Sequence, residues 1–368
     1  MLAPMPFSLF LNPRFRAAAS VTLPDQEYQQ AKSAIISWDG YDVTPLRELP
    51  ELARRANLDA IYLKDEASRF GLGSFKALGG AYAVACAPPN ARVVTCATDG
   101  NHGRAVAWGA QRFNRRCVIF VHEMVSQGRI DAIARYGAEV RRVPGTYDDA
   151  VREASRQAEA HNWYIVSDTS WPGYTEVPRL IMQGYRLMAD EAADQWRGAP
   201  PTHVFVQGGV GGVAAAVAVQ LRARFQPAPM LIVVEPDRAA CLLASAKLGQ
   251  PATVPGSLDT LMAGLACGEP SLLAWQELDH AAAAFMAIPD DAAVATMRLL
   301  ADHGIVAGES GVAGLAGCLL AAGDVAARES LGLGPSSRVL VFSTEGATDS
   351  SLYRQLVGKN PENVAISR

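Results

Sequence analysis

Apolar runs typical of β-strands alternate along this chain with alanine-rich amphipathic runs typical of helices. This alternation predicts an α/β fold in which mostly parallel sheets are covered by helices on both faces. The first 40 residues fit neither pattern and look irregular. The predicted strands are residues 60–64, 92–97, 116–121, 139–144, 203–207, 230–236 and 338–343. The predicted helices are residues 74–87, 103–113, 126–136, 147–161, 176–195, 211–224, 290–303 and 311–322.

The length and composition of the chain allow two domains. Its 368 residues are 49% hydrophobic, which is enough to bury a large core. The stretch DQWRGAPPT (194–202) is the best candidate for a crossing between domains. We therefore expect a small domain at 85–195, inserted in a large domain formed by 1–84 and 196–368.

Charge, hydropathy and cysteine usage exclude several classes of function. A net charge of -4 gives no electrostatic case for binding nucleic acid, and no stretch approaches the roughly 18 apolar residues of a membrane span. The N-terminal residues 1–16 lack the basic region of a secretory signal. Six cysteines without a CxxC spacing argue against a structural zinc site and favour a reducing cytoplasm. Cys241 and Cys267 are the alternative for a disulfide, but free, mostly buried thiols are expected. The expected partner is a small molecule.

A lysine lies at an unusual place in the stretch RFGLGSFKALGGAYAVACAPP (69–89). Ser74 is a good helix N-cap, which puts Lys76 in the first turn. The helix dipole and burial both disfavour an ammonium group there, so we expect a neutral amine. Gly79 and Gly80 weaken a helix interior, and we expect them to let a bulky planar group approach the backbone.

A glycine-rich loop follows the strand predicted at 203–207. In QGGVGGVAAAVAV (207–219) the strand runs into four glycines and then into a helix. Converging backbone amides and a helix N-terminus form a cradle for a phosphate. The alternative is a tight turn that packs the helix on the sheet, but packing alone rarely needs so many glycines.

A dinucleotide site is a competing interpretation of the same loop. Residues 209–214 satisfy GxGxxA, and Glu235 ends the next predicted strand, as a ribose-binding acid does. That pattern is common by chance and leaves Lys76 unexplained. A P-loop is excluded because no GK[ST] follows. An NAD-dependent oxidoreductase is therefore the alternative from another class.

Two more loops follow predicted strands, where open α/β sheets bind ligands. In TCATDGNHGRAVAWGA (95–110) the backbone amides that precede a helix suit a substrate carboxylate. Asp99 as a helix cap and His102 as a structural histidine are the plainer interpretations. In RVLVFSTEGATD (338–349) the strand delivers the hydroxyls of Ser343 and Thr344 to the end of the sheet.

Together, the three loops and the lysine meet the needs of pyridoxal 5'-phosphate: an amine for a Schiff base, a phosphate cradle and a partner for the ring nitrogen. The chain resembles the tryptophan-synthase-β-like (fold type II) pyridoxal phosphate enzymes. More narrowly, it resembles their diaminopropionate ammonia-lyase group over nearly the whole chain after residue 40. The segments that carry the resemblance are KDEASRFGLGSFKALGG, ATDGNHGRAVAW, SDTSWPGYTEVPRLIMQGY, DTLMAGLACGEPS, GESGVAGLAG and FSTEGATD.

The resemblance implies two open twisted, mostly parallel sheets flanked by helices, and a homodimer. It also implies that Lys76 forms the Schiff base, that Asn101 contacts the ring oxygen and that Thr344, or else Ser343, faces the ring nitrogen. Glu309 and Ser310 begin another loop that lines the pocket, although a helix cap explains Ser310 as well. The other cofactor-binding residues implied are Phe75, Gly208, Gly209, Val210, Gly211 and Gly212, and the implied substrate-binding residues are Thr98, Asp99, Gly100 and His102.

The resemblance gives Asp99 and Asp168 catalytic roles. Elimination of ammonia from 2,3-diaminopropionate moves one proton from Cα and another to the leaving amine, and a carboxylate near each face can do this. The expected products are pyruvate and ammonia, with one aspartate for each substrate enantiomer as an option. Asp168 as a loop cap is the plainer interpretation. A serine or threonine dehydratase of the same fold is the first alternative, and a catalytically silent binding relative is another.

Overall fold

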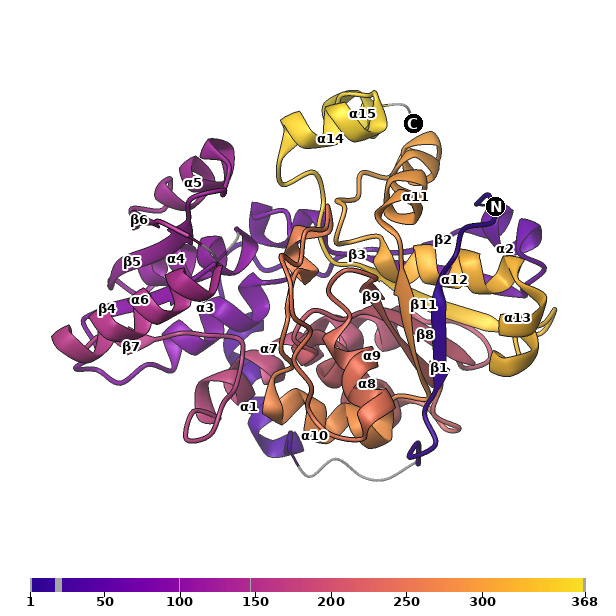
Figure 1. Cartoon of the computed structure of the whole chain (residues 1–368), viewed down its shortest axis with the longest axis horizontal. Helices are drawn as coiled ribbons and strands as arrows, with labels where there is room; N and C mark the ends of the chain where they lie inside the picture. The colour runs from indigo at the N-terminus through magenta and orange to yellow at the C-terminus, as the bar shows by residue number, and fades with distance from the viewer. Residues whose placement is uncertain (1, 17–21, 99, 146, 367–368) are drawn as a thin grey trace.

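The chain forms two β-sheets with helices on their faces. The computed structural model describes residues 2–16, 22–98, 100–145 and 147–366. In Figure 1 the smaller sheet and its helices lie to the left of the larger sheet. The two mostly parallel sheets confirm the predicted fold class.

The larger sheet has seven strands in the order β1-β10-β9-β8-β11-β3-β2. The edge strands β1 and β2 pair antiparallel to their neighbours, and the other pairings are parallel. The strand bounds are β1 Ser8–Leu11, β2 Leu46–Glu48, β3 Ala60–Asp65, β8 His203–Gln207, β9 Met230–Pro236, β10 Ala284–Ile288 and β11 Arg338–Ser343.

The smaller sheet has four parallel strands in the order β6-β5-β4-β7. All four lie inside the segment 85–195 that was expected to form the small domain. Helix α7, at the end of that segment, packs against α8 of the large part, so the exact boundary stays a prediction. The strand bounds are β4 Val93–Ala97, β5 Arg116–His122, β6 Glu139–Val143 and β7 Tyr164–Ile165.

Fifteen α-helices and two short 3₁₀ helices connect and cover these strands in the described chain. Their bounds are α1 Asp25–Ile36, α2 Pro50–Arg55, η1 Glu66–Gly71, α3 Ala77–Ala85, α4 Asn101–Arg112, α5 Gln127–Ala134, α6 Tyr147–His161, α7 Glu176–Gln195, α8 Gly212–Arg224, α9 Cys241–Leu248, η2 Ala263–Leu265, α10 Leu272–Ala281, α11 Asp290–Asp302, α12 Ala313–Gly323, α13 Val325–Leu331, α14 Ser350–Val357 and α15 Pro361–Ile366. None of the described helices is long and apolar enough to cross a membrane.

The larger sheet is buried on both faces, which explains its unbroken apolar strands. Along β8, Val204 and Val206 join the hydrophobic core that contains α7 and α8, whereas Phe205 joins the core that contains α11 and α12. Successive side chains of a strand point to opposite faces, so a strand between two helix layers must be apolar at every position. The strand therefore ends its apolar run only at Gln207, where the loop toward the site begins.

The region around Lys76 differs from the prediction. Helix α3 begins at Ala77, so Lys76 is its N-cap residue, and Ser74 instead forms a β-bridge with Glu345. A Cβ built on Gly79 lies 2.4 Å from the Tyr185 ring, and one on Gly80 lies 3.1 Å from Ala105 Cβ. These glycines therefore allow α3 to pack closely against α7 and α4. The planar group that approaches Gly79 is the ring of Tyr185, whereas Gly80 faces Ala105.

The N-terminal segment, expected to be irregular, contains an edge strand and a helix. Strand β1 extends the larger sheet, and α1 packs against α7. The six cysteines are free thiols, of which Cys96, Cys117, Cys241 and Cys318 are buried.

Candidate active site

The loops after β4, β8 and β11 meet in one pocket at the carboxyl ends of the strands. Both sheets contribute to it, since α4 follows β4 of the smaller sheet and α8 follows β8 of the larger one. The pocket brings together most of the residues that the sequence singled out. Its lining includes Phe75, Lys76, Thr98, Gly100, Asn101, His102, Asp168, Gly209, Val210, Gly211, Gly212, Ser310 and Thr344.

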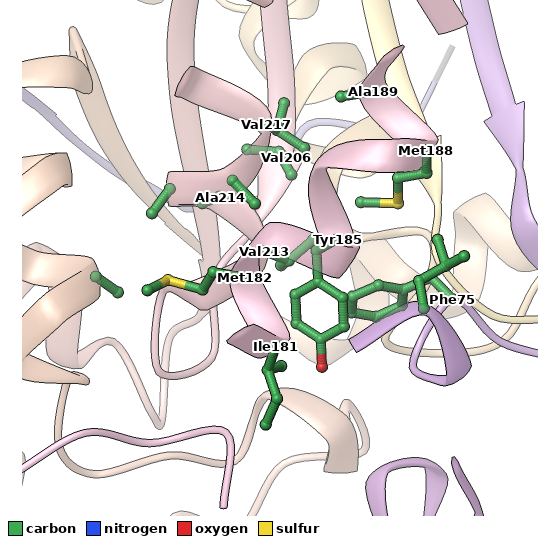
Figure 2. Packing of buried hydrophobic residues seen from close by; sticks show 14 of the residues in the cluster. Phe75, Ile181, Met182, Tyr185, Met188, Ala189, Val206, Val213, Ala214 and Val217 are labelled. Carbon is green, nitrogen blue, oxygen red and sulfur yellow. The ribbon is translucent and has the colours of Figure 1, made fainter. Parts of the chain in front are cut away.

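Lys76 extends into this pocket beside two aromatic rings. Its Nζ lies 5.5 Å from the ring centroid of Phe75 and 5.7 Å from that of Tyr185. The two rings contact each other with centroids 4.6 Å apart, and Figure 2 shows the Tyr185 ring beside the Phe75 ring. The Tyr185 hydroxyl is buried on the same side, and burial raises its pKa. The amine therefore lies in a mostly apolar wall with one buried hydroxyl beside it.

Lys76 forms an ion pair with Asp168. Lys76 Nζ lies 2.5 Å from Asp168 Oδ2. Although burial alone lowers the pKa of the lysine, the carboxylate outweighs it and raises the pKa above its usual value. The neutral amine expected from the sequence is therefore wrong, because Asp168, from a distant segment of the chain, pairs with the ammonium group and favours its charged form.

Asp168 is shared between Lys76 and His102. Burial alone raises the pKa of its carboxyl group, but the Lys76 ammonium holds that pKa well below the usual range. His102 Nδ1 lies 3.8 Å from Asp168 Oδ2, and its Nε2 is 2.7 Å from the carbonyl of Val166. Burial lowers the pKa of His102, so the neutral ring donates from Nε2 and turns a bare Nδ1 toward the carboxylate.

The glycine loop (residues 207–212) faces Lys76 from the other sheet. The amides of Gly209, Val210 and Gly211 make no hydrogen bond within the described chain, and α8 begins at Gly212. Gly211 has a φ of 98°, which glycine adopts without strain. A Cβ on Gly209 would lie 3.2 Å from Cys267 Sγ and 3.3 Å from the Gly264 carbonyl oxygen, so a side chain there would crowd the pocket wall that these residues form. These unused amides at a helix N-terminus fit the phosphate of pyridoxal 5'-phosphate.

Gly208 has a different role from the rest of this loop. It is absent from the pocket lining, and its amide donates to the carbonyl of Val234. A Cβ there would lie 2.6 Å from Val233 Cγ1 and 2.7 Å from Leu242 Cδ1. Gly208 therefore allows close packing of the loop on β9 and α9, and its expected contact with the cofactor is not supported.

Thr344 presents its hydroxyl to the pocket, whereas Ser343 does not line it. The side-chain amide of Gln207 donates to Thr344 Oγ1 at 2.6 Å and is also directed at the carbonyls of Gly311 and Phe342. Two backbone acceptors thus fix which end of the Gln207 amide faces Thr344. Because the Thr344 oxygen accepts this bond, its own proton can be donated to a ring nitrogen.

The loop after β4 is organised by Thr98. Its Oγ1 accepts hydrogen bonds from the amides of Gly100 and Gly103, both at 3.0 Å. Those amides are therefore not available to a substrate carboxylate, whereas those of Asn101 and His102 make no hydrogen bond within the described residues. Asp99 lies outside the described residues.

Glu345, not proposed as a site residue from the sequence, lies at the centre of a polar cluster. It accepts a hydrogen bond from Asn101 Nδ2, and a second one from the Ser310 amide at 3.0 Å. Arg104 donates to Asn101 Oδ1 at 2.6 Å. Glu345 lines the pocket and is 4% exposed. In the sequence Glu345 looked like part of an ordinary turn. Its position directly after a predicted strand was the one feature that could have indicated a site residue.

Glu309 and Ser310 both have partners across this wall. Glu309 pairs with Arg129 at 2.9 Å, and burial raises the pKa of its carboxyl group to about 7. Ser310 Oγ accepts from the amide of Gly264 at 3.0 Å, and α12 begins later, at Ala313. Ser310 therefore lines the pocket and is not the helix cap.

The dinucleotide interpretation fails at Glu235. This carboxyl group is fully buried, burial raises its pKa to about 8, and it accepts hydrogen bonds from the amides of Leu242 and Leu243, both at 2.7 Å. It therefore caps the start of α9 and is not available to a ribose.

Comparisons with known proteins agree with this geometry. A family profile described as pyridoxal-phosphate dependent enzyme matches residues 38–345. The chain is 42% identical to a diaminopropionate ammonia-lyase of Escherichia coli (strain K12), over 89% of this chain and 90% of that protein. The crystal structure of the holo form of diaminopropionate ammonia-lyase from Escherichia coli superposes with a TM-score of 0.91 at 37% identity, covering 98% and 99% of the two chains. A biosynthetic L-threonine dehydratase of Salmonella typhimurium (strain LT2) is more distant, at 30% identity over 81% of this chain and 56% of that protein.

Proposed function

Because this chain belongs to the pyridoxal-phosphate dependent enzymes, we propose that it eliminates ammonia from 2,3-diaminopropionate and yields pyruvate and ammonia. The observation that carries this function is the contact between Lys76 and Asp168 inside a pocket that also holds an unused glycine cradle. An amine, a carboxylate and a phosphate site are thereby within reach of one small ligand. Relatives named for this activity support the proposal, because one is similar to this chain in sequence and another in structure.

Four groups of this chain would hold the cofactor. Lys76 would bind its aldehyde carbon, the amides of 209–212 would receive its phosphate, and Thr344 would donate a hydrogen bond to its ring nitrogen. Asn101 would face the ring oxygen, and Phe75 flanks the lysine. When bound, pyridoxal 5'-phosphate withdraws electrons from the substrate Cα and so makes its proton acidic. A hydroxyl at the ring nitrogen, in place of a carboxylate, leaves that nitrogen unprotonated.

Asp168 serves as the acid–base residue on one face of the substrate. The carboxylate holds the substrate's side-chain ammonium, accepts a proton from Cα or delivers one to the leaving nitrogen. The Lys76 ammonium lowers the pKa of Asp168, so loss of that charge raises the pKa again and makes the carboxylate a better proton acceptor. Asp99 is proposed for the other face, and Thr98, Gly100 and His102 for substrate binding. Thr98 acts there by shaping the loop.

The dehydratase of the same fold is the alternative function. It shares the cofactor and the elimination, but it expels water in place of ammonia. The experiment measures pyruvate formation by the purified holoenzyme from D-diaminopropionate, L-diaminopropionate and serine in separate reactions. Formation of 2-oxobutyrate from threonine is measured in parallel. We expect diaminopropionate to be turned over fastest. Comparable or faster turnover of serine contradicts the assignment.

The cytoplasmic location, the homodimer and the division into domains stay predictions. Light scattering coupled to gel filtration tests the dimer, for which one chain of 39.1 kDa predicts a particle of twice that mass. The location in the cytoplasm is tested by fractionation of the cells that make the protein.

A further inference from the structure

Glu345 is held rigidly by a loop that wraps around it. The amide of Gly308 donates to the carbonyl of Glu345 at 2.9 Å, and the Ser310 amide donates to its Oε1. A Cβ built on Gly308 would lie 2.9 Å from Glu345 Cγ, and one on Gly311 would lie 2.8 Å from the Glu345 carbonyl oxygen. Only residues without a side chain allow this approach. The GESG segment (308–311) therefore fixes one carboxylate oxygen and leaves Oε2 directed at Asn101.

The carboxamide of Asn101 lies between a pure acceptor and a pure donor. Both carboxylate oxygens of Glu345 accept hydrogen bonds, and the guanidinium of Arg104 can only donate them. Asn101 Nδ2 must therefore face Glu345 while Oδ1 faces Arg104. This is the orientation that the two hydrogen bonds show. The opposite orientation would place donor against donor and acceptor against acceptor. One N–H of the amide remains for a ligand in the pocket.

We infer that Glu345 and Arg104 are positioning residues that fix the Asn101 carboxamide with its free N–H toward the ring oxygen of the cofactor. This inference rests on the proposed function, because the ring oxygen is that of pyridoxal 5'-phosphate. A reversed amide would offer its carbonyl oxygen to an electron-rich ring oxygen and repel it. The clamp crosses the pocket, since Asn101 and Arg104 belong to α4 and Glu345 follows β11.

Glu345→Gln tests the clamp by reversing its polarity. The Ser310 amide keeps an oxygen at the Oε1 position, so the new side-chain nitrogen falls where Oε2 faced Asn101. Asn101 must then turn over, and its Nδ2 meets the donors of Arg104. We expect cofactor binding to weaken about 10-fold to 100-fold, as for a lost hydrogen bond to a charged group, and the absorbance maximum of the bound cofactor to shift.

Arg104→Met is a second, independent test, because it removes the donor at the other end and keeps the side-chain length. It too should shift the absorbance maximum. Both changes should have no further effect on the spectrum in an Asn101→Ala background, since they act through Asn101. Glu139→Gln is the control: Glu139 is exposed on β6 and pairs with Arg116 away from the pocket lining, so the absorbance maximum should stay in place.

The spectra are recorded on purified holoenzyme, and far-ultraviolet circular dichroism shows that each variant is folded. If Glu345→Gln fails to fold, Arg104→Met and the Asn101→Ala background decide the question. Unshifted spectra in the single variants, equal shifts with and without Asn101, or a shift in Glu139→Gln would each overturn the inference. A wild-type protein that binds no cofactor would overturn the proposed function itself, and this outcome is recognised before any variant is made.

Discussion

The amine of Lys76 and the carboxylate of Asp168 form a 2.5 Å ion pair between residues 92 positions apart in the chain. The pair raises the pKa of the lysine and lowers that of the aspartate. A cofactor bound to the lysine nitrogen would remove the cation beside the carboxylate and leave Asp168 free to hold the substrate's ammonium group. The same contact therefore neutralises two buried charges and places the acid–base group where the substrate would lie.

Asp168→Asn should slow elimination strongly while leaving the cofactor bound. An asparagine keeps the shape of the side chain but cannot accept a proton, so we expect kcat to fall about 10²-fold to 10⁴-fold. Rates with D- and L-diaminopropionate, measured separately, show which enantiomer depends on this face.

Asp302→Asn is the control for this change, because Asp302 is exposed on α11 and pairs with Lys359. It should leave turnover unchanged. Near-normal kcat of Asp168→Asn with both enantiomers would mean that Asp168 only caps its loop.

Neighbouring glycines of the glycine loop should respond differently to alanine. At Gly208 a Cβ collides with the buried side chains of Val233 and Leu242, so Gly208→Ala should lower the free energy of unfolding by about 1–3 kcal/mol. At Gly209 the Cβ crowds the pocket wall beside Cys267, so Gly209→Ala should weaken cofactor binding on the order of tenfold with a smaller loss of stability.

Thermal unfolding of the apoprotein and titration with pyridoxal 5'-phosphate measure the two effects for each variant. The same pattern of losses in both variants would contradict the distinction between a packing glycine and a cradle glycine.

The buried His102 should make the apoprotein less stable in mild acid. Burial lowers its pKa below the unfolded value of about 6.5, so the unfolded chain binds the proton first. Stability is therefore full above that unfolded pKa and is lost as the pH falls from about 6.5 toward the folded pKa. His102→Gln keeps a donor for the Val166 carbonyl and should flatten this dependence.

His203 provides the comparison, since burial also lowers its pKa but it lies away from the pocket and contacts Thr202 and the Leu331 carbonyl. His203→Gln should flatten the stability curve as well, whereas only His102→Gln should change the pH profile of kcat/KM. Identical kinetic profiles for both variants would remove His102 from the site.

The fold was largely predictable because its central strands are buried on both faces. Their sequences are therefore unbroken runs of apolar residues. Strands β8, β9 and β11 have the predicted bounds. Strand β10 was missed because AFMAI follows a run of alanines that suits a helix equally well. Strand β1 was missed because an edge strand of four residues buries too little to leave a pattern.

The site was predictable as a set of loops but not as a set of contacts. Lys76, Asn101 and Thr344 were found because each lies in a glycine-bounded loop after or beside a strand. The charge state of Lys76 depends on Asp168, and the orientation of Asn101 depends on Glu345, 244 positions away. Such long-range partners leave no local signal in the sequence.

The covalent attachment of the cofactor to Lys76 is the central claim, and the chain offers a clean test because it has five lysines. Lys64 is the sharpest rival: it is fully buried with a lowered pKa, but its amine contacts Thr44, Gln195 and Glu191 away from the pocket lining. The holoenzyme is reduced with borohydride, digested and analysed by mass spectrometry. We predict the pyridoxyl mass on Lys76, and none in Lys76→Ala; the label on Lys64 or on any other lysine would contradict the account.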